Sequence, residues 1–364
     1  MKKFFLYLLL LILPLLILLP FPIYCLYVSG ELMSFDKYIH RLDKKQLWGL
    51  AYNYYDREYK FYMTDYLRPD IVELGTSRSM QVDENLFNSK YSFYNAGGAV
   101  QNSQDYYRFV KNLSYNPKLI IIDLNHFFFN SNSDKTPPTL YKKPELNGLG
   151  VVKNCMNFYT DFLRGKIKIK KLYNSNIGML AKMYDDGFSY TGFYHYGRII
   201  TNPSLASDYN FKNTTKRIKK HCERFQTCKS VDLNTVDQIK LFIKECHDRN
   251  IKVVAFLPPF SHHVLQMMQG DGNYQYLHMI YNHLKPFFQI EGFYLYDYTD
   301  VTKIGGEDRN FIDGFHAGVP VTNLIFKDIL TQNSSLSSYF TSSENIDSIN
   351  KEYINNYPSF HNIK

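Results

Sequence analysis

The sequence predicts an α/β protein: a three-layer α/β/α domain with a mainly parallel sheet, preceded by one N-terminal transmembrane helix. Short apolar runs alternate along the chain with amphipathic segments of helical length, which is the pattern of βαβ units. Several runs are apolar throughout, as in parallel strands that are buried on both faces. The 364 residues are 45% hydrophobic and 21% charged, a composition typical of a packed globular protein.

The N-terminus carries the membrane signal. Residues 4–28 contain no charged residue and follow Lys2 and Lys3. At about 1.5 Å per residue, a helix of this length spans the roughly 30 Å of a bilayer core. The two lysines favour a cytoplasmic N-terminus, which places the rest of the chain outside the cytoplasmic membrane. We therefore expect a single-pass anchor over residues 1–30; cleavage as a signal peptide near residues 28–30 is the alternative.

Charge and cysteine content give no support for a nucleic-acid-binding protein or a metalloprotein. The net charge of +8 is spread along the chain, and no nucleic-acid-binding motif accompanies it. The densest basic run, residues 164–171, could contact anionic lipid or polymer, although such a run is more often a solvated face. Four of the five cysteines follow the anchor, where pairing is allowed, and Cys222 and Cys228 would close the shortest loop. No spacing of Cys or His indicates a metal site, and we expect no cofactor.

The order of the predicted elements indicates the domain organisation. A juxtamembrane helical region covers residues 31–68, the α/β domain covers residues 69–332, and a polar tail that we expect to fray covers residues 333–364. Within the domain, residues 127–234 show weak patterning and are interpreted as an insertion or lid. Strands are predicted over residues 71–74, 91–94, 119–123, 251–257 and 293–296, and helices over residues 103–113, 235–249, 273–288 and 321–330.

A serine lies where the first predicted strand ends. Gly75 breaks the apolar run and Ser77 follows it, at the carboxyl end where open α/β sheets bind ligands. A serine hydroxyl becomes a nucleophile when a neighbouring base accepts its proton, and that base is usually a histidine oriented by a carboxylate. The chain offers one compact pair of this kind, Asp313 and His316, with Gly314 in the turn between them. We therefore predict that Ser77, His316 and Asp313 are catalytic.

Acyl transfer also needs hydrogen-bond donors for the oxyanion that forms. The Ser77 N–H group is one candidate. The others are the loop N–H groups at Gly98 and Val100 and the side-chain amide of Asn125, because each follows a predicted strand and reaches the same sheet edge. Arg78 adjoins the nucleophile. It is a candidate for binding an anionic substrate group, or it pairs with a nearby carboxylate as part of the structure.

The order of these residues resembles the SGNH (GDSL-type) superfamily of hydrolases and acyltransferases. The run Gly75-Thr-Ser77 is similar to the Gly-Asp-Ser block of that superfamily, with threonine in place of aspartate. Residues 95–100 are similar to its glycine block, with Val100 in place of the last glycine. A backbone donor needs no particular side chain, so this replacement leaves the implied chemistry possible.

The two later blocks of the superfamily are also present. Asn125 matches the asparagine of the third block, and the run Asp313-Gly-Phe-His316 matches the Asp-x-x-His block fully. The resemblance covers residues 70–126 and 251–330. It implies an SGNH or flavodoxin-like fold in which the serine forms an acyl-enzyme and the histidine acts as base and then as acid.

Within this superfamily, an N-terminal anchor with a Gly-Thr-Ser-Arg run is similar to extracytoplasmic proteins that acylate envelope polymers. Examples are polysaccharide O-acetylation proteins and the D-alanyl-transfer proteins of teichoic acid synthesis. The resemblance implies transfer of an acyl group, most simply acetyl, to a cell-surface glycan or cell-wall polymer, with a membrane-bound O-acyltransferase as donor partner. Two alternatives stay open: a carbohydrate esterase or deacetylase with the same triad, and a non-catalytic, membrane-tethered envelope scaffold.

Overall fold

The computed structural model describes residues 13, 18–133, 136–206 and 208–356. The chain divides into two compact units, each assembled from segments that are far apart in the sequence. Unit 1 consists of Met1–Tyr55, Lys143–Tyr190 and His195–Gly197; unit 2 consists of Asp56–Lys142, Thr191–Tyr194 and Arg198–Lys364. The segment 127–234, expected to be one insertion, is therefore shared between the two units.

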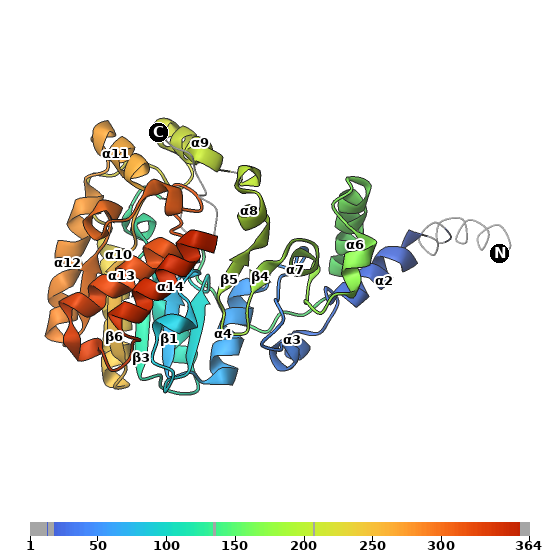
Figure 1. Cartoon of the computed structure of the whole chain (residues 1–364), viewed down its shortest axis with the longest axis horizontal. Helices are drawn as coiled ribbons and strands as arrows, with labels where there is room; N and C mark the ends of the chain where they lie inside the picture. Colours follow the sequence, from blue (N-terminus) through green and yellow to red (C-terminus); the bar gives the residue numbers. More distant parts are fainter. Residues whose placement is uncertain (1–12, 14–17, 134–135, 207, 357–364) are drawn as a thin grey trace. The chain divides into compact units, whose positions relative to one another are not determined.

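Unit 2 is built on a five-stranded parallel sheet with the strand order β2-β1-β3-β6-β7 (Figure 1). The strands are β1 (Ile71–Gly75), β2 (Phe93–Gly97), β3 (Leu119–Asp123), β6 (Lys252–Leu257) and β7 (Tyr294–Asp297). Every residue of β1, β2 and β3 is buried, as in parallel strands that are covered on both faces, and this includes the polar residues Glu73 of β1 and Asn95 of β2. The predicted α/β fold with a mainly parallel sheet is confirmed, with small shifts at the strand ends.

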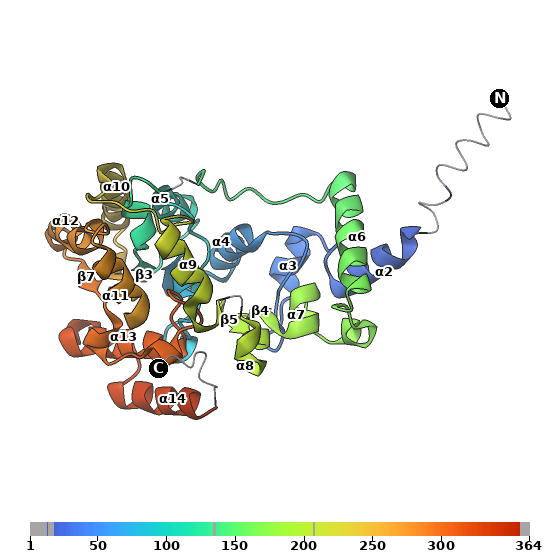
Figure 2. The ribbon, with the colours of Figure 1, turned by 90° about the horizontal axis from the view of Figure 1, so that it is seen from above.

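Helices cover both faces of this sheet. On one side lie α5 (Ser103–Asn112), α10 (Leu233–Asp248) and α12 (Tyr276–Ile290), and on the other α13 (Val319–Gln332) and α14 (Ser343–Asn356) (Figure 2). α10 packs against both α5 and α12. The remaining helices of unit 2 are α4 (Asp56–Leu67), α9 (Lys212–Lys220) and α11 (His262–Asp271). The four predicted helices are all present, and α11 is one that the sequence reading did not include.

The C-terminal tail differs from the prediction. Up to residue 356, where the described residues end, it forms α14 instead of fraying, and α14 packs on α13. Phe340 and Ile346 are buried, and the Phe340 ring lies 5.2 Å from the Phe87 ring and 5.7 Å from the Phe326 ring. A few apolar side chains spaced through a polar segment are enough to hold it on the domain.

Unit 1 is mainly helical. Its elements are α2 (Pro20–Ser29), α3 (Phe35–Arg41), α6 (Gly148–Leu163), α7 (Met179–Tyr184) and β4 (Asp186–Phe188), which pairs with β5 (Tyr194–Tyr196). The short helix α8 (Gly197–Thr201) follows β5, and from Arg198 on it belongs to unit 2. The apolar core contains Cys25, Leu26, Cys155, Phe158, Ile167, Leu172, Met179 and Met183. The Glu31 carboxylate ties these segments together, because its Oε1 accepts hydrogen bonds from the N–H groups of Ala51 at 2.7 Å and Met179 at 2.8 Å.

The predicted membrane anchor falls mostly outside the described residues, which omit residues 1–12 and 14–17. Within the part of the chain that is described, no helix is both long and apolar enough to cross a bilayer. α2 is the described end of the predicted anchor, and its Cys25 and Leu26 belong to the core of unit 1. The anchor over residues 1–30 stays a prediction.

Candidate active site

β1 ends in a turn that fits only glycine at its first position. A Cβ atom on Gly75 would lie 1.7 Å from Oδ1 of Asp123, at the end of β3. Asp123 holds the next residue of the turn: its Oδ1 accepts from the Thr76 N–H at 2.7 Å and its Oδ2 accepts from the Thr76 hydroxyl at 2.6 Å. Ser77 follows directly, so its hydroxyl is placed at the sheet edge by a turn that is bonded to the neighbouring strand.

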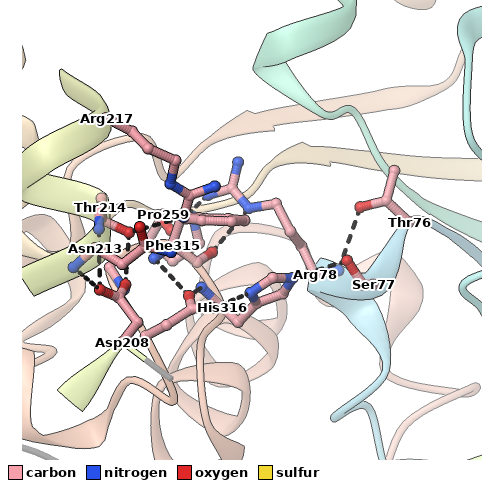
Figure 3. A network of polar contacts seen from close by, with 12 residues as sticks. Thr76, Ser77, Arg78, Asp208, Asn213, Thr214, Arg217, Pro259, Phe315 and His316 are labelled. Atoms are coloured by element: carbon pink, nitrogen blue, oxygen red, sulfur yellow. Dashed lines mark hydrogen bonds and ion pairs between the residues drawn. The ribbon is translucent and has the colours of Figure 1, made fainter. Parts of the chain in front are cut away.

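Three side chains form a continuous hydrogen-bonded row at this edge. The Ser77 hydroxyl lies 2.7 Å from His316 Nε2 (Figure 3), and His316 Nδ1 lies 2.7 Å from Asp313 Oδ2. In the tautomer that carries its proton on Nδ1, His316 donates to Asp313 and accepts from Ser77. Ser77 and His316 are both partly exposed. The structure thus brings together the three residues predicted to be catalytic.

The Asp313 carboxylate is held in its ionised form. Burial alone would raise its pKa, but the adjacent His316 and two backbone N–H groups outweigh burial and lower the pKa of Asp313 to about 2. The two donors to Oδ1 are the N–H groups of Phe315 at 3.0 Å and His316 at 2.8 Å. At neutral pH, Asp313 therefore presents a full negative charge to the imidazole and fixes its orientation.

The turn between Asp313 and His316 is clamped from outside by Asp208 (Figure 3). Asp208 Oδ2 accepts from the Gly314 N–H at 3.3 Å and from the Thr214 hydroxyl at 2.6 Å, and its Oδ1 accepts from the Thr214 N–H at 2.9 Å. Asp208 is 4% exposed. Sequence reasoning missed this residue, because it lies in the weakly patterned segment where no motif marks it.

Arg78 is buried, and its guanidinium joins the nucleophile to three other loops. Nε donates to the Phe315 carbonyl at 2.9 Å, and Nη2 donates to the carbonyls of Pro258 at 3.0 Å and Pro259 at 2.7 Å. Nη1 lies 3.2 Å from His126 Nδ1. Burial lowers the pKa of Arg78 to about 10, so the side chain stays charged at neutral pH. With its donors used in this way, the contacts favour the structural alternative over binding of an anionic substrate.

The loop N–H groups of Gly98 and Val100 are already occupied. The Gly98 N–H donates to the carbonyls of Gly75 and Thr76, both at 2.9 Å, and the Val100 N–H donates to the Gly75 carbonyl at 3.1 Å. The prediction that these two groups bind the oxyanion is therefore corrected. The cause is the sheet register. Gly75 pairs with Gly97, so the backbone that follows β2 lies next to the end of β1 and bonds to it.

Two of the predicted donors remain beside the hydroxyl. The Ser77 N–H begins the short 3-10 helix Ser77–Ser79, where an N–H group has no partner within the helix. Asn125 is buried after β3; its Oδ1 accepts from the Phe127 N–H at 3.2 Å, which fixes the amide. Its Nδ2 lies 3.4 Å from the Thr76 hydroxyl, next to the nucleophile. That contact is too long to be strong, so the amide can donate elsewhere.

Two further carboxyl groups lie under this turn. Burial raises the pKa of Asp123 to about 7, against the lowering effect of the hydrogen bonds from Thr76. Glu73, in the middle of β1, is also buried, and burial together with Asp123 raises its pKa well above the ordinary range. Through its hydrogen bonds to Thr76, Asp123 supports the turn that carries Ser77.

A cation and aromatic rings border the loop that carries Asp313 and His316. The Arg217 guanidinium, on α9, lies beside the Phe315 ring (Figure 3), 5.5 Å from its centroid. It also lies 5.3 Å from the ring centroid of Phe225. Its Nη2 donates to the Thr214 hydroxyl at 3.2 Å. The Phe315 ring also lies 5.7 Å from the Phe127 ring. Arg217 comes from the same weakly patterned segment as Asp208, and sequence reasoning missed it for the same reason.

Across the described residues, no group of three or more His, Cys, Asp or Glu side chains could hold a metal ion. All five cysteines are free thiols, so Cys222 and Cys228 do not form the disulfide that their spacing allows.

Comparison with known proteins identifies no relative from which the role of this site could be inferred. No protein-family model matches the chain, and no curated protein matches its sequence. The functional interpretation therefore depends on the row of side chains at the sheet edge and on the sequence blocks that supply it.

Proposed function

We propose that this protein is an SGNH-type serine acyltransferase or esterase with Ser77 as its nucleophile. The observation that carries the proposal is the unbroken Ser77–His316–Asp313 row, with 2.7 Å at each of its two contacts. Serine, imidazole and carboxylate in this order and at hydrogen-bond distance form the arrangement that activates a hydroxyl for attack on a carbonyl carbon.

The first half-reaction forms an acyl-serine. Ser77 Oγ attacks the carbonyl carbon of the acyl donor while its proton passes to His316 Nε2, and Asp313 stabilises the resulting imidazolium. The Ser77 N–H and the Asn125 amide donate to the oxyanion of the tetrahedral intermediate. When the intermediate collapses, the bond to the leaving alcohol breaks, and His316 returns its proton to that alcohol.

The second half-reaction consumes the acyl-serine. His316 accepts the proton of an incoming hydroxyl, whose oxygen attacks the acyl carbon and forms the new ester. Collapse of the second tetrahedral intermediate returns the proton to Ser77 Oγ and regenerates the enzyme. If water is the incoming hydroxyl, the same steps release a free acid, so transferase and esterase share all of the machinery.

The proposed acceptor is a hydroxyl of a cell-surface glycan or cell-wall polymer, and the proposed acyl group is acetyl. The uncharged residues 4–28 after Lys2 and Lys3 support a catalytic domain held outside the cytoplasmic membrane. In that compartment, acyl groups need a carrier across the bilayer. A membrane-bound O-acyltransferase is therefore the proposed donor partner, on the strength of the resemblance to envelope-acylating SGNH proteins.

Acyl-enzyme trapping tests the proposal. Full-length protein in detergent is incubated with p-nitrophenyl acetate, and its intact mass is measured after acid quenching. We expect one acetyl group on the wild-type protein, located on Ser77, and none on Ser77→Ala. Ser337→Ala, which changes an exposed serine of the same unit, serves as the matched control and should acylate like the wild type.

Adding an oligosaccharide separates the remaining alternatives. Acetylated sugar indicates transfer, whereas acetic acid released at the same rate with and without sugar indicates an esterase. If the wild type is never acylated, and Ser77→Ala leaves cell-surface glycan modification unchanged, the protein is a scaffold and the catalytic proposal fails.

A further inference from the structure

Helix α6 of unit 1 carries apolar side chains on two different sides. One side contributes Cys155 and Phe158 to the core of the unit. The other side carries Leu149, Val152, Met156 and Leu163, which are 85%, 42%, 66% and 82% exposed. Spacings of three, four and seven residues place these four side chains along one face of the helix. We call this face the outer stripe. A row of large exposed apolar side chains on one helix marks a surface that contacts something else.

Positive charge borders the outer stripe. Residues 147–173 contain six basic residues and one acidic residue, Asp161, so the segment carries a net charge of 6 − 1 = +5. That single carboxylate is paired with Lys166 at 2.8 Å. Lys153 and Arg164 are exposed on α6, and Lys168 and Lys170 are exposed in the segment that follows it. The contacting surface is therefore one that carries negative charge.

Exposed tyrosines lie in the same unit. Tyr24 and Tyr27 of α2 are 53% and 74% exposed, and Tyr173 is 63% exposed. The hydroxyls of Tyr24 and Tyr173 lie 3.4 Å apart, which joins α2 to the segment after α6. Tyrosine is enriched where a protein meets the headgroup region of a bilayer, because its ring is apolar and its hydroxyl is wet.

We infer that the outer stripe and its basic border rest on a bilayer that contains anionic lipid. An apolar helix face flanked by lysine and arginine is the form of a helix that lies in the plane of a membrane surface. The predicted anchor is also attached to the same helix: Phe21 of α2 packs on the core-facing side of α6, with ring centroids 5.7 Å from Phe158 and 5.3 Å from Phe162. This inference concerns unit 1 and stands apart from the proposed catalytic function.

Tryptophan quenching by brominated lipid tests the inference. The chain has one tryptophan, Trp48, which is fully buried, so a new tryptophan on the stripe reports on its own surroundings. Full-length Met156→Trp is reconstituted into vesicles of brominated phosphatidylglycerol and phosphatidylcholine. Leu241→Trp, at a 47% exposed leucine of α10 in unit 2, is the matched control. We expect about twofold stronger quenching at position 156 than at position 241.

The charge requirement is tested on the same protein. Lys168→Gln/Lys170→Gln in the Met156→Trp background, or vesicles of phosphatidylcholine alone, should reduce the quenching, and so should raised salt. All of these variants change exposed side chains, and far-UV circular dichroism is used to check that each variant folds. Equal quenching at positions 156 and 241 overturns the inference. Shielding of position 156 from aqueous iodide that rises with protein concentration, without quenching by lipid, also overturns it and assigns the stripe to a second copy.

Discussion

The Arg78 guanidinium donates a hydrogen bond to the Phe315 carbonyl at 2.9 Å, so the residue after the nucleophile holds the residue before the proposed base. The same side chain bonds the carbonyls of Pro258 and Pro259 after β6. One buried cation thus connects the loops that must meet for the Ser77–His316 contact to form. Its role is to position those loops, and this role leads to the first prediction.

Arg78→Lys should lower kcat strongly while leaving KM nearly unchanged. Lysine keeps the charge but cannot reach several carbonyls at fixed angles as the guanidinium fork does. We expect kcat for aryl-ester hydrolysis to fall about 100-fold and unfolding free energy to fall by about 2–4 kcal/mol. Arg309→Lys, at an exposed arginine, is the control and should change neither quantity. A rise in KM with unchanged kcat would instead restore Arg78 as a substrate-binding residue.

Asp313→Asn should remove part of the acid sensitivity of the fold. The pKa of Asp313 is lowered to about 2 in the folded protein from an ordinary value of 3.8. A lowered pKa stabilises the fold above the ordinary value, and this stabilisation is lost as pH falls from about 4 to about 2. The variant should lose about 2 kcal/mol less than the wild type over that window in urea unfolding. An identical pH dependence in both proteins would contradict the assignment.

Asn125→Ala should slow catalysis without weakening substrate binding. Loss of one oxyanion donor costs about 100- to 1000-fold in kcat in enzymes of this chemistry, because the donor acts on the transition state alone. Asn112→Ala, which removes an amide whose Nδ2 bonds the carbonyl of Arg108 on the exposed side of α5, is the control. Steady-state kinetics with an aryl acetate measure both. If kcat stays within about twofold of the wild type, the oxyanion is held by other groups.

Gly75→Ala should disrupt the nucleophile turn. The added Cβ would lie 1.7 Å from Asp123 Oδ1, so the Thr76–Asp123 hydrogen bonds and the turn must shift. We expect a loss of about 3 kcal/mol or more in unfolding free energy, and no acylation of Ser77. Gly148→Ala tests the same chemical change where a Cβ meets nothing within 4 Å, and it should leave both stability and activity intact. Thermal unfolding and acyl-enzyme mass measure the difference.

The sheet and the triad could be predicted because their signals are local. The central strands β1, β3 and β6 are short runs of mostly apolar consecutive residues, so their burial can be predicted from the local sequence. Asp313 and His316 are three residues apart, so their contact at 2.7 Å depends only on one turn. The position of Ser77 follows from its place after a strand, since all parallel strands end at one edge.

The features that sequence reasoning missed depend on contacts between distant segments. The Gly98 and Val100 N–H groups bond the backbone of the first turn, and only the register of β1 on β2 decides that. Asp208 reaches Gly314 across 106 positions from a segment without periodicity. Residues 143–190 belong to unit 1 because of how they pack, and no change in composition marks this segment in the sequence.

The nucleophile and its base are separated by 239 positions in the chain. A ribosome that adds about 5–20 residues per second therefore releases Ser77 about 10–50 s before it has made His316. During this interval Ser77 has no histidine to accept its proton, so its hydroxyl is not activated for attack on an acyl donor. If the proposed function holds, the protein is therefore inactive throughout its own synthesis, and fragments that end before His316 have no acylating activity.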